Sequence, residues 1–205
     1  RPGERFASDL SAQHVASLVP LAGTVLEIGA GRGTKTALMQ ARALEELGHP
    51  TLIHTVDIHE FKAHLLSQRM EQMGIPGVTT HVGDATDLDA IADLQRAFDA
   101  VFIDAPCSGT GTLRRHPEIR WRIDPRDIES LTQVQAQMLQ SAASYVRAGG
   151  TLVYATCSVL DSENDALVEA FLNTPAGAQF TLVERFASVP TEEGPDGHFA
   201  VVLRK

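Results

Sequence analysis

Short apolar runs along the chain alternate with longer segments in which apolar residues recur at helical spacing. The runs predict strands, because they are rich in β-branched residues and are bounded by glycine, proline or acidic residues. We expect seven strands, at 24–28, 51–56, 78–82, 100–103, 151–155, 180–184 and 199–203. We expect helices at 8–19, 36–48, 58–73, 88–97 and 124–147, and another that begins at Asp161. The last two strands have no helix between them and predict a hairpin.

This alternation of strands and helices predicts a Rossmann-like α/β fold with a mostly parallel seven-stranded sheet. Helices are expected on both faces, and the final pair of strands predicts an antiparallel C-terminal edge. A length of 205 residues suits one domain, residues 1–205, with 1–22 as a helical lead-in. No apolar run is long enough to span a membrane, and no signal peptide opens the chain. Because the chain starts at Arg1 and not at Met, we expect it to be part of a longer protein.

Cysteine count and net charge narrow the classes of protein that fit. The chain has two cysteines, which indicates a reduced, cytoplasmic protein rather than a secreted disulfide scaffold. Two cysteines are too few for a cysteine-rich zinc site, and no His-Cys spacing resembles one, so we expect no metal. The net charge of −9 argues against a uniformly basic nucleic-acid-binding surface but leaves room for a local basic patch.

A glycine-rich turn follows the first predicted strand directly and leads into a helix. Its spacing is Gly29-x-Gly31-x-Gly33. Glycines let the backbone pass close to a ligand, and the start of a helix presents free N–H groups. The turn is typical of nucleotide-binding α/β folds, although it lacks the full G-x-G-x-x-G dinucleotide pattern. The alternative is a tight strand-to-helix turn that binds no ligand.

Acidic residues follow three of the other strands. Asp57 is placed to bond ribose hydroxyls, or to cap the next helix. Asp84 is placed to contact the amino group of an adenine, or to cap a loop. Asp104 ends the fourth strand. Ligands of open α/β sheets bind outside the carboxyl ends of the strands, so Gly29 and the three acids are expected at one rim.

Two longer motifs contain the cysteines. Residues 104–111 read DAPCSGTG and include Cys107, and residues 152–165 read LVYATCSVLDSEND and include Cys157. They resemble the two signatures of the NOL/NOP/Sun family of RNA cytosine-5 methyltransferases. RRHPEIRWR at 114–122 and GPDGHFAVVLRK at 194–205 are similar to the bacterial Sun/Fmu branch, the small-subunit rRNA methyltransferase B type.

The first motif departs from the family pattern. The family usually has a sequence close to D-x-C-A-A-P-G-G-K-T, where residues 27–36 of this chain read EIGAGRGTKT. The matching positions are Ala30, Gly33, Lys35 and Thr36, and the departures are Gly29, Gly31, Arg32 and Thr34. The departures make the motif similar to the generic E-x-G-x-G-x-G of S-adenosylmethionine enzymes.

The resemblance implies a class I S-adenosylmethionine-dependent methyltransferase fold with S-adenosyl-L-methionine as cofactor. It implies that Cys157 is the nucleophile, that Cys107 acts in product release, and that Asp104 contacts both the methionine end of the cofactor and the cytosine edge. Lys35 steadies the base or the methionine carboxylate, or is an ordinary exposed lysine at a helix start. The expected cofactor-binding residues are Gly29, Ala30, Gly31, Arg32, Gly33, Thr34, Lys35, Asp57, Asp84 and Asp104.

The resemblance also implies an RNA partner, with 16S rRNA favoured, and a monomer. The family's N-terminal RNA-binding domain is expected to be missing from this chain. Arg114, Arg115, Arg120 and Arg122 are candidates for phosphate contacts, and His116 or Trp121 for stacking on RNA. For Trp121 a place in the core is the alternative. The other histidines, His198 included, show no ligand spacing and are expected at the surface or in local packing.

Three alternatives remain at this point. The nucleophile is Cys107 if the site works like that of DNA cytosine methyltransferases. The chain is a non-catalytic RNA-binding or ribosome-assembly module if the altered glycine motif no longer binds cofactor. A nicotinamide oxidoreductase is disfavoured by the glycine spacing and by the absence of a Tyr-Lys pair.

Overall fold

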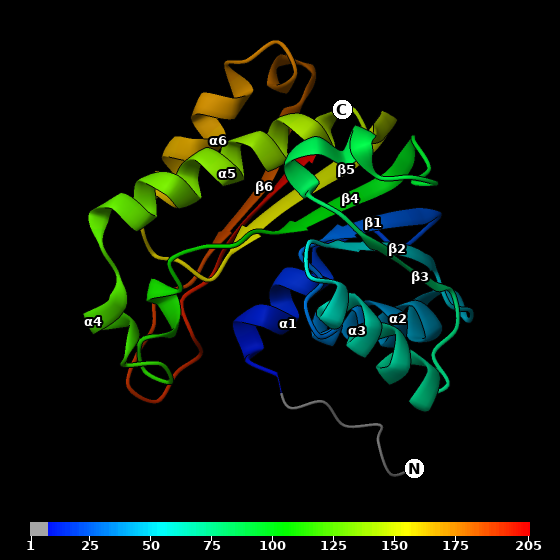
Figure 1. Ribbon diagram of the computed structural model, residues 1–205, viewed down its shortest axis with the longest axis horizontal. Coiled ribbons are helices and arrows are strands. Elements are labelled where there is room, and N and C mark those ends of the chain that lie inside the picture. The colour runs from blue at the N-terminus through cyan, green and yellow to red at the C-terminus, as the bar shows by residue number, and fades with distance from the viewer. Residues whose placement is uncertain (1–7) are drawn as a thin grey trace.

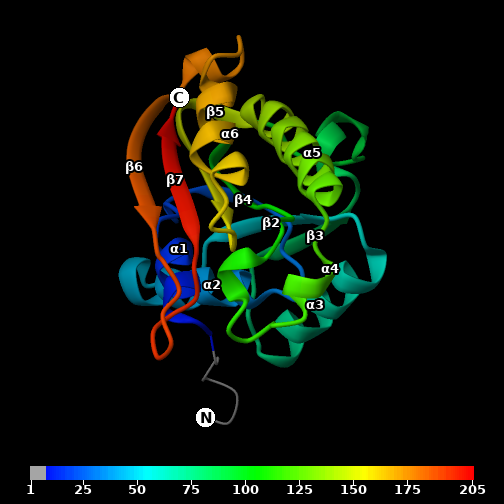
Figure 2. The ribbon, with the colours of Figure 1, turned by 90° about the vertical axis from the view of Figure 1, so that its left-hand side faces the viewer.

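The computed structural model describes residues 8–205, and Figure 1 shows one twisted sheet with helices on both faces. The sheet order is β3-β2-β1-β4-β5-β7-β6. The first five strands are parallel, and β7 runs antiparallel between β5 and β6. The strands are β1 (Thr24–Ile28), β2 (Leu52–Asp57), β3 (Val78–Val82), β4 (Phe98–Asp104), β5 (Val146–Thr156), β6 (Thr181–Ala187) and β7 (Phe199–Arg204). The expected mixed sheet is confirmed, including the C-terminal hairpin at its edge (Figure 2).

The helices divide between the two faces of the sheet. In Figure 1, α5 and α6 cover one face, and α1, α2 and α3 cover the other. The α-helices are α1 (Leu10–Ser17), α2 (Thr34–Leu47), α3 (Glu60–Gln72), α4 (Ile119–Arg122), α5 (Pro125–Ala143) and α6 (Asp165–Leu172). Short 3₁₀ turns occur at η1 (Ala85–Ala90), η2 (Thr110–Thr112), η3 (Asp161–Glu163) and η4 (Gly177–Gln179).

The central strands are buried on both faces, which explains why they read as apolar runs rather than as an alternating pattern. On one face Val101 and Ile103 of β4 belong to a core cluster with Leu139 of α5. On the other face Phe102 of β4 belongs to a second cluster with Met39 of α2. All five side chains are fully buried, so β4 is fixed from both sides and its end is a rigid base for the residues that follow.

The expected helix at 88–97 is wrong. Residues Ala85–Ala90 form the 3₁₀ turn η1, and turns and bends lead from there to β4. Asp93 and Ala97 have φ angles of 60° and 69°, in the left-handed region that an α-helix of L-residues cannot include. The segment packs through Leu88 against the cluster that contains α5.

The expected helix at 124–147 runs on too far. Helix α5 ends at Ala143, and Val146 already begins β5, which was expected to start at residue 151. Val146 pairs with Phe98 of β4, and the register shifts before the next pairs of these strands. Pairing with a neighbouring strand therefore overrides the helical pattern at 144–147. This effect cannot be predicted from the local sequence.

Candidate active site

A cavity of about 860 Å³ lies at the carboxyl ends of the parallel strands. Nine of the expected site residues line it: Gly29, Gly31, Thr34, Lys35, Asp57, Asp84, Asp104, Cys107 and Cys157. Ala30, Arg32 and Gly33 do not line it. Ala30 and Gly33 are buried, and Arg32 is exposed outside the cavity. The convergence follows from the topology, because parallel strands deliver their ends to one rim.

Gly29 lets the first loop cross between two neighbouring strands. Its N–H donates to the carbonyl of Val56 at 2.9 Å, and its φ is +79°. A Cβ at this position would lie 2.2 Å from the carbonyl oxygen of Asp104. Gly33 starts α2 with a φ of +76°, and a Cβ there would lie 2.9 Å from Leu66 of α3. Gly29 therefore shapes the cavity, whereas Gly33 allows two helices to pack closely.

Asp57 stabilises the glycine loop from the next strand. One carboxylate oxygen accepts from the N–H of Gly31 at 3.2 Å, and the other accepts from the N–H of His59 at 2.9 Å. The N-cap of α3 is His59, so the alternative role of Asp57 as helix cap is wrong. Asp84 does cap the η1 turn, since its side chain accepts from the N–H of Thr86 at 2.9 Å. Both acids still line the cavity.

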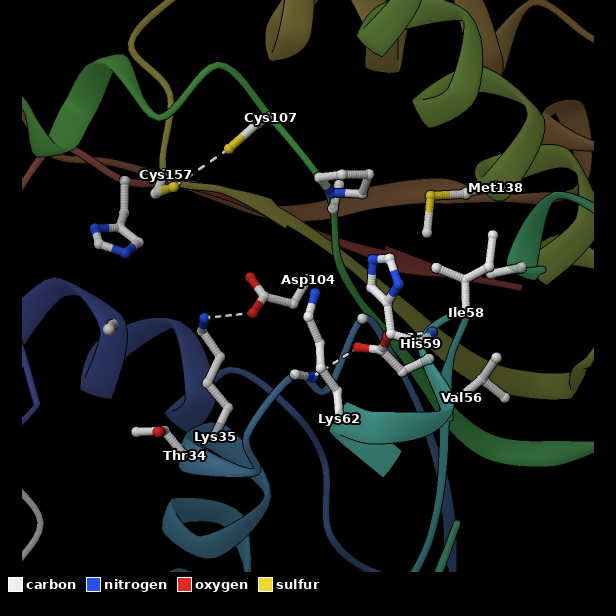
Figure 3. A pocket seen from close by; sticks show the side chains of 18 of the residues that line it. Thr34, Lys35, Val56, Ile58, His59, Lys62, Asp104, Cys107, Met138 and Cys157 are labelled. Atoms are coloured by element: carbon white, nitrogen blue, oxygen red, sulfur yellow. Dashed lines mark hydrogen bonds and ion pairs between the residues drawn. The ribbon is translucent and has the colours of Figure 1, made fainter. Parts of the chain in front are cut away.

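Lys35 and Asp104 form an ion pair across the cavity floor. Lys35 Nζ lies 2.6 Å from Asp104 Oδ2, and the lysine side chain is only 16% exposed. Figure 3 shows the two groups pointing toward each other. Burial alone would lower the pKa of Lys35, but the carboxylates of Asp104 and Glu27 raise it. The alternative of an ordinary exposed lysine is therefore wrong.

Glu27 lies beneath this ion pair and is fully buried. One of its oxygens accepts from the Thr36 hydroxyl at 2.6 Å. The other has no hydrogen-bond partner within the described part of the chain. Burial raises the pKa of Glu27 to about 7. Lys35 is therefore paired with Asp104, which lines the cavity, and not with the buried Glu27.

The two sulfur atoms face each other at the rim of the cavity, 3.3 Å apart (Figure 3). Both cysteines are free thiols in loops that follow adjacent strands, β4 and β5. The hydrogen bond from the Cys107 thiol lowers the pKa of Cys157 against the opposing effect of burial, and nearby Lys35 also lowers it. The same contact, together with burial, raises the pKa of Cys107. Cys157 is thus the better nucleophile of the pair, because the thiolate is the reactive form.

Alkylation kinetics will check this difference between the thiols. We expect Cys157 to react with iodoacetamide at a pH where Cys107 is still protonated, because the rate at each sulfur rises through its own pKa. Initial rates at each cysteine can be measured by peptide mass spectrometry. In a Cys107→Ala protein the midpoint for Cys157 should move to higher pH, because the donated hydrogen bond is lost. Equal midpoints at the two cysteines would contradict the assignment.

Sequence reasoning missed the cavity residues that come from the two ends of the described chain. His198 is buried, in keeping with local packing rather than with the surface, but it also lines the cavity, which was not expected. Burial and Lys35 lower its pKa, which keeps the imidazole neutral at pH 7. The signal was available: β7 is antiparallel, so its first residue lies at the rim where the parallel strands end.

The N-terminal helix forms part of the same wall. Ser8, Asp9 and Ala12 line the cavity, and Asp9 is the N-cap of α1. Asp9 Oδ2 accepts from the N–H of Asp196 at 2.9 Å, and Ser11 donates to Ser188 at 2.9 Å. The lead-in helix is therefore held against the loop between β6 and β7.

Helix α5 contributes to the cavity through Val134 and Met138. These two residues belong to an apolar stripe of Leu131, Val134, Met138 and Leu139, of which Met138 and Leu139 are buried in the core. Leu131 is only half-buried, and Val134 is 36% exposed, so the stripe is partly a cavity wall.

The basic segment at 114–122 lies beside the cavity. Arg115 lines the cavity and bonds the buried carboxylate of Asp196 through Nε at 2.7 Å. Arg120 and Arg122 are exposed. Trp121 is 84% exposed, so its alternative place in the core is wrong. The segment therefore presents cations and one large aromatic ring to solvent.

Comparison with protein families identifies the chain. A family model described as 16S rRNA methyltransferase RsmB/F matches residues 18–200. The chain belongs to this family. It is 38% identical over 173 residues to Ribosomal RNA small subunit methyltransferase B of Escherichia coli O6:K15:H31, covering 83% of this chain and 39% of the relative. It is 33% identical to the protein of the same name from Shewanella oneidensis, covering 99% and 48%.

Solved structures show the same fold. The crystal structure of PH0851 has a TM-score of 0.86 and 27% identity, covering 98% of this chain and 47% of the other. NSun6 from Pyrococcus horikoshii with SFG has a TM-score of 0.82 and 21% identity, covering 98% and 53%. The fold is the class I S-adenosylmethionine-dependent methyltransferase fold, and S-adenosylmethionine is the cofactor. The chain spans less than half the length of these curated relatives.

Residues 8–205 contain neither a candidate membrane span nor a candidate metal cluster. None of the helices described there is long and apolar enough to cross a membrane. No group of three or more His, Cys, Asp or Glu side chains in that range is arranged to hold a metal ion.

Proposed function

We propose that this chain is the catalytic part of an S-adenosylmethionine-dependent methyltransferase that modifies carbon 5 of cytidine in RNA, with 16S rRNA as substrate. The observation that carries the proposal is the pair of sulfurs 3.3 Å apart in the cavity that also holds the glycine loop. The names of the matched relatives support ribosomal RNA as the substrate class.

The chemistry explains why two thiols and an ion pair belong in one cavity. Carbon 5 of cytosine is a poor nucleophile until a thiolate adds to carbon 6. We assign this addition to Cys157. S-adenosylmethionine would supply the methyl group to carbon 5 and leave as S-adenosylhomocysteine. The proton on carbon 5 would then pass to solvent as the ring double bond forms again, and Cys157 would leave carbon 6 as a thiolate. Asp104 and Lys35 steady the pyrimidine edge, and Cys107 acts in release.

The residues that line the cavity fit the cofactor. Gly29 brings the backbone to the cavity with no side chain in the way. Asp57 is assigned to the ribose hydroxyls and Asp84 to the adenine amino group. Ile58 is 58% exposed beside Asp57 and offers an apolar surface to the adenine ring. Lys35 and Asp104 face the methionine end. Thr34 also lines the cavity, whereas Ala30, Arg32 and Gly33 of the same loop do not.

The exposed basic segment supports RNA as the partner. The ring of Trp121 is free to stack on an unpaired base, and Arg120 and Arg122 are free to contact phosphates. Arg115 reaches the cavity while Asp196 holds it, so it is assigned to the phosphate next to the target nucleotide. A local basic patch of this kind reconciles RNA binding with a net charge of −9.

Removing the second thiol separates bond formation from release. We expect Cys107→Ala to keep methyl transfer in the first turnover and to accumulate a covalent adduct between Cys157 and RNA. The adduct is expected because addition to carbon 6 needs only Cys157, whereas breaking that bond needs Cys107. Denaturing gels and mass spectrometry of the protein incubated with unmodified 16S rRNA and labelled cofactor will detect it. Loss of bond formation in this variant would move the nucleophile to Cys107.

The altered glycine motif favours one competing function, a non-catalytic RNA-binding or ribosome-assembly module. Calorimetry with S-adenosylmethionine separates the two functions. Binding in the micromolar range supports the enzyme, and absence of binding at millimolar cofactor supports the module.

A further inference from the structure

Glu163 lies buried between the two cysteine loops, although it faces neither the cofactor nor the RNA side of the cavity. Its side chain is fully buried at the end of the η3 turn, which follows the loop of Cys157. It does not line the cavity. A buried carboxylate needs donors on both oxygens to offset its loss of hydration.

Four donors meet the Glu163 carboxylate. The hydroxyls of Ser108 and Ser158 both donate to Oε2 at 2.5 Å. The N–H of Ser108 donates to Oε1 at 2.8 Å, and Gln135 Nε2 donates to the same oxygen at 3.0 Å. Hydrogen bonds to a carboxylate are among the stronger ones in proteins, so the contacts hold both serines firmly.

The two serines are the residues that directly follow the two cysteines. Ser108 comes after Cys107, and Ser158 comes after Cys157. One carboxylate oxygen thus fixes the backbone next to both sulfurs. A second tie between the loops is the bond from the N–H of Gly111 to the carbonyl of Cys157 at 2.9 Å.

We propose that Glu163 is a positioning residue that fixes the two thiols relative to each other. In this position Cys107 can act in the release of the bond that Cys157 forms with the RNA. This rests on the function proposed above. The sulfurs lie 3.3 Å apart in loops whose cysteines are 50 residues apart in sequence, and the serine contacts of Glu163 span the gap between these loops. A misplacement of about 1 Å is enough to cost roughly 100-fold in rate at an active site.

Single serine variants test separately the hydrogen bonds that Glu163 accepts from Ser108 and from Ser158. We expect Ser108→Ala to loosen the loop of Cys107, so that the first methyl transfer proceeds but the RNA adduct persists at least tenfold longer than in the unmodified protein. We expect Ser158→Ala to loosen the loop of Cys157, so that adduct formation slows at least tenfold. Glu163→Gln should show both defects, because the amide nitrogen, a donor itself, would face two hydrogen-bond donors in place of either oxygen.

The matched control is Glu169→Gln, an exposed glutamate on the neighbouring helix α6. Quenched-flow samples on denaturing gels give the adduct, and labelled cofactor gives the methyl transferred. Calorimetric affinity for S-adenosylmethionine reports whether each variant is folded. If Glu163→Gln does not fold, the serine variants decide. A purely structural role would lower stability in all variants without separating the two steps.

The inference fails if both serine variants match Glu169→Gln in adduct formation and in release while the unmodified protein forms an adduct. The proposed function fails, and the inference with it, if the unmodified protein forms no adduct and Cys157→Ala retains full activity. The two failures are therefore distinguishable in one set of experiments.

Discussion

Replacing Cys157 by alanine is expected to abolish methyl transfer while leaving S-adenosylmethionine affinity within about twofold of the unmodified protein. Loss of an enzyme's nucleophile typically costs roughly 10⁴-fold or more in rate. Cys107 is not expected to replace it, because burial still raises the pKa of that thiol after its contact with residue 157 is lost. The cofactor contacts come from other loops and remain. Transfer of labelled methyl to unmodified 16S rRNA, with calorimetry in parallel, measures both quantities.

The Cys107→Ala protein is the matched control, since it removes a thiol of the same size from the same pair. Cys157→Ala should form no RNA adduct, in contrast to Cys107→Ala. Full activity of Cys157→Ala would exclude the covalent mechanism proposed here. Activity lost only in Cys107→Ala would exchange the roles of the two sulfurs.

The second large effect is expected for Gly29→Ala, which should destabilise the fold by about 3–5 kcal/mol and abolish cofactor binding. The new Cβ would sit 2.2 Å from the backbone oxygen of Asp104, so the loop must move away from β4. The φ of +79° adds strain for any residue with a Cβ. Thermal unfolding should show a midpoint lowered by roughly 10 °C, and calorimetry should show no S-adenosylmethionine binding.

The Gly48→Ala variant measures the cost of backbone strain without a steric clash. Gly48 ends α2 with a φ of +75°, but a Cβ there would meet nothing within 4 Å. We expect a cost of about 1 kcal/mol and unchanged cofactor affinity for this variant. Equal losses in the two variants would mean that backbone strain alone, and not the approach of Gly29 to β4, shapes the loop.

The sheet could be predicted from sequence because strands that are buried on both faces read as continuous apolar runs. β1 and β3 have the expected bounds, and the rim acids follow from the rule that parallel strands end at one edge. The segment 88–97 could not be predicted, because its course depends on left-handed backbone at Asp93 and Ala97. The start of β5 at Val146 depends on pairing with Phe98, a contact between distant residues.

The site was predictable as a set of positions but not as a set of contacts. The adjacent strands β4 and β5 bring the two thiols close together, yet local sequence does not give a separation of 3.3 Å between them. The ion pair of Lys35 with Asp104 joins residues 69 positions apart, and it decided between two roles for the lysine. Trp121 is exposed because none of the residues of the short helix α4 is buried, and composition alone does not reveal this.

The hydrogen bond from the N–H of Asp196 to Asp9, which lines the cavity, joins residues 187 positions apart. Contacts between such distant residues form late in folding, because closing a long loop costs entropy before the contact repays it. During synthesis, the strands that carry the glycine loop and both thiols leave the ribosome before residue 196 does. We therefore expect a growing chain to hold an open, incomplete cavity until β7 pairs with β5.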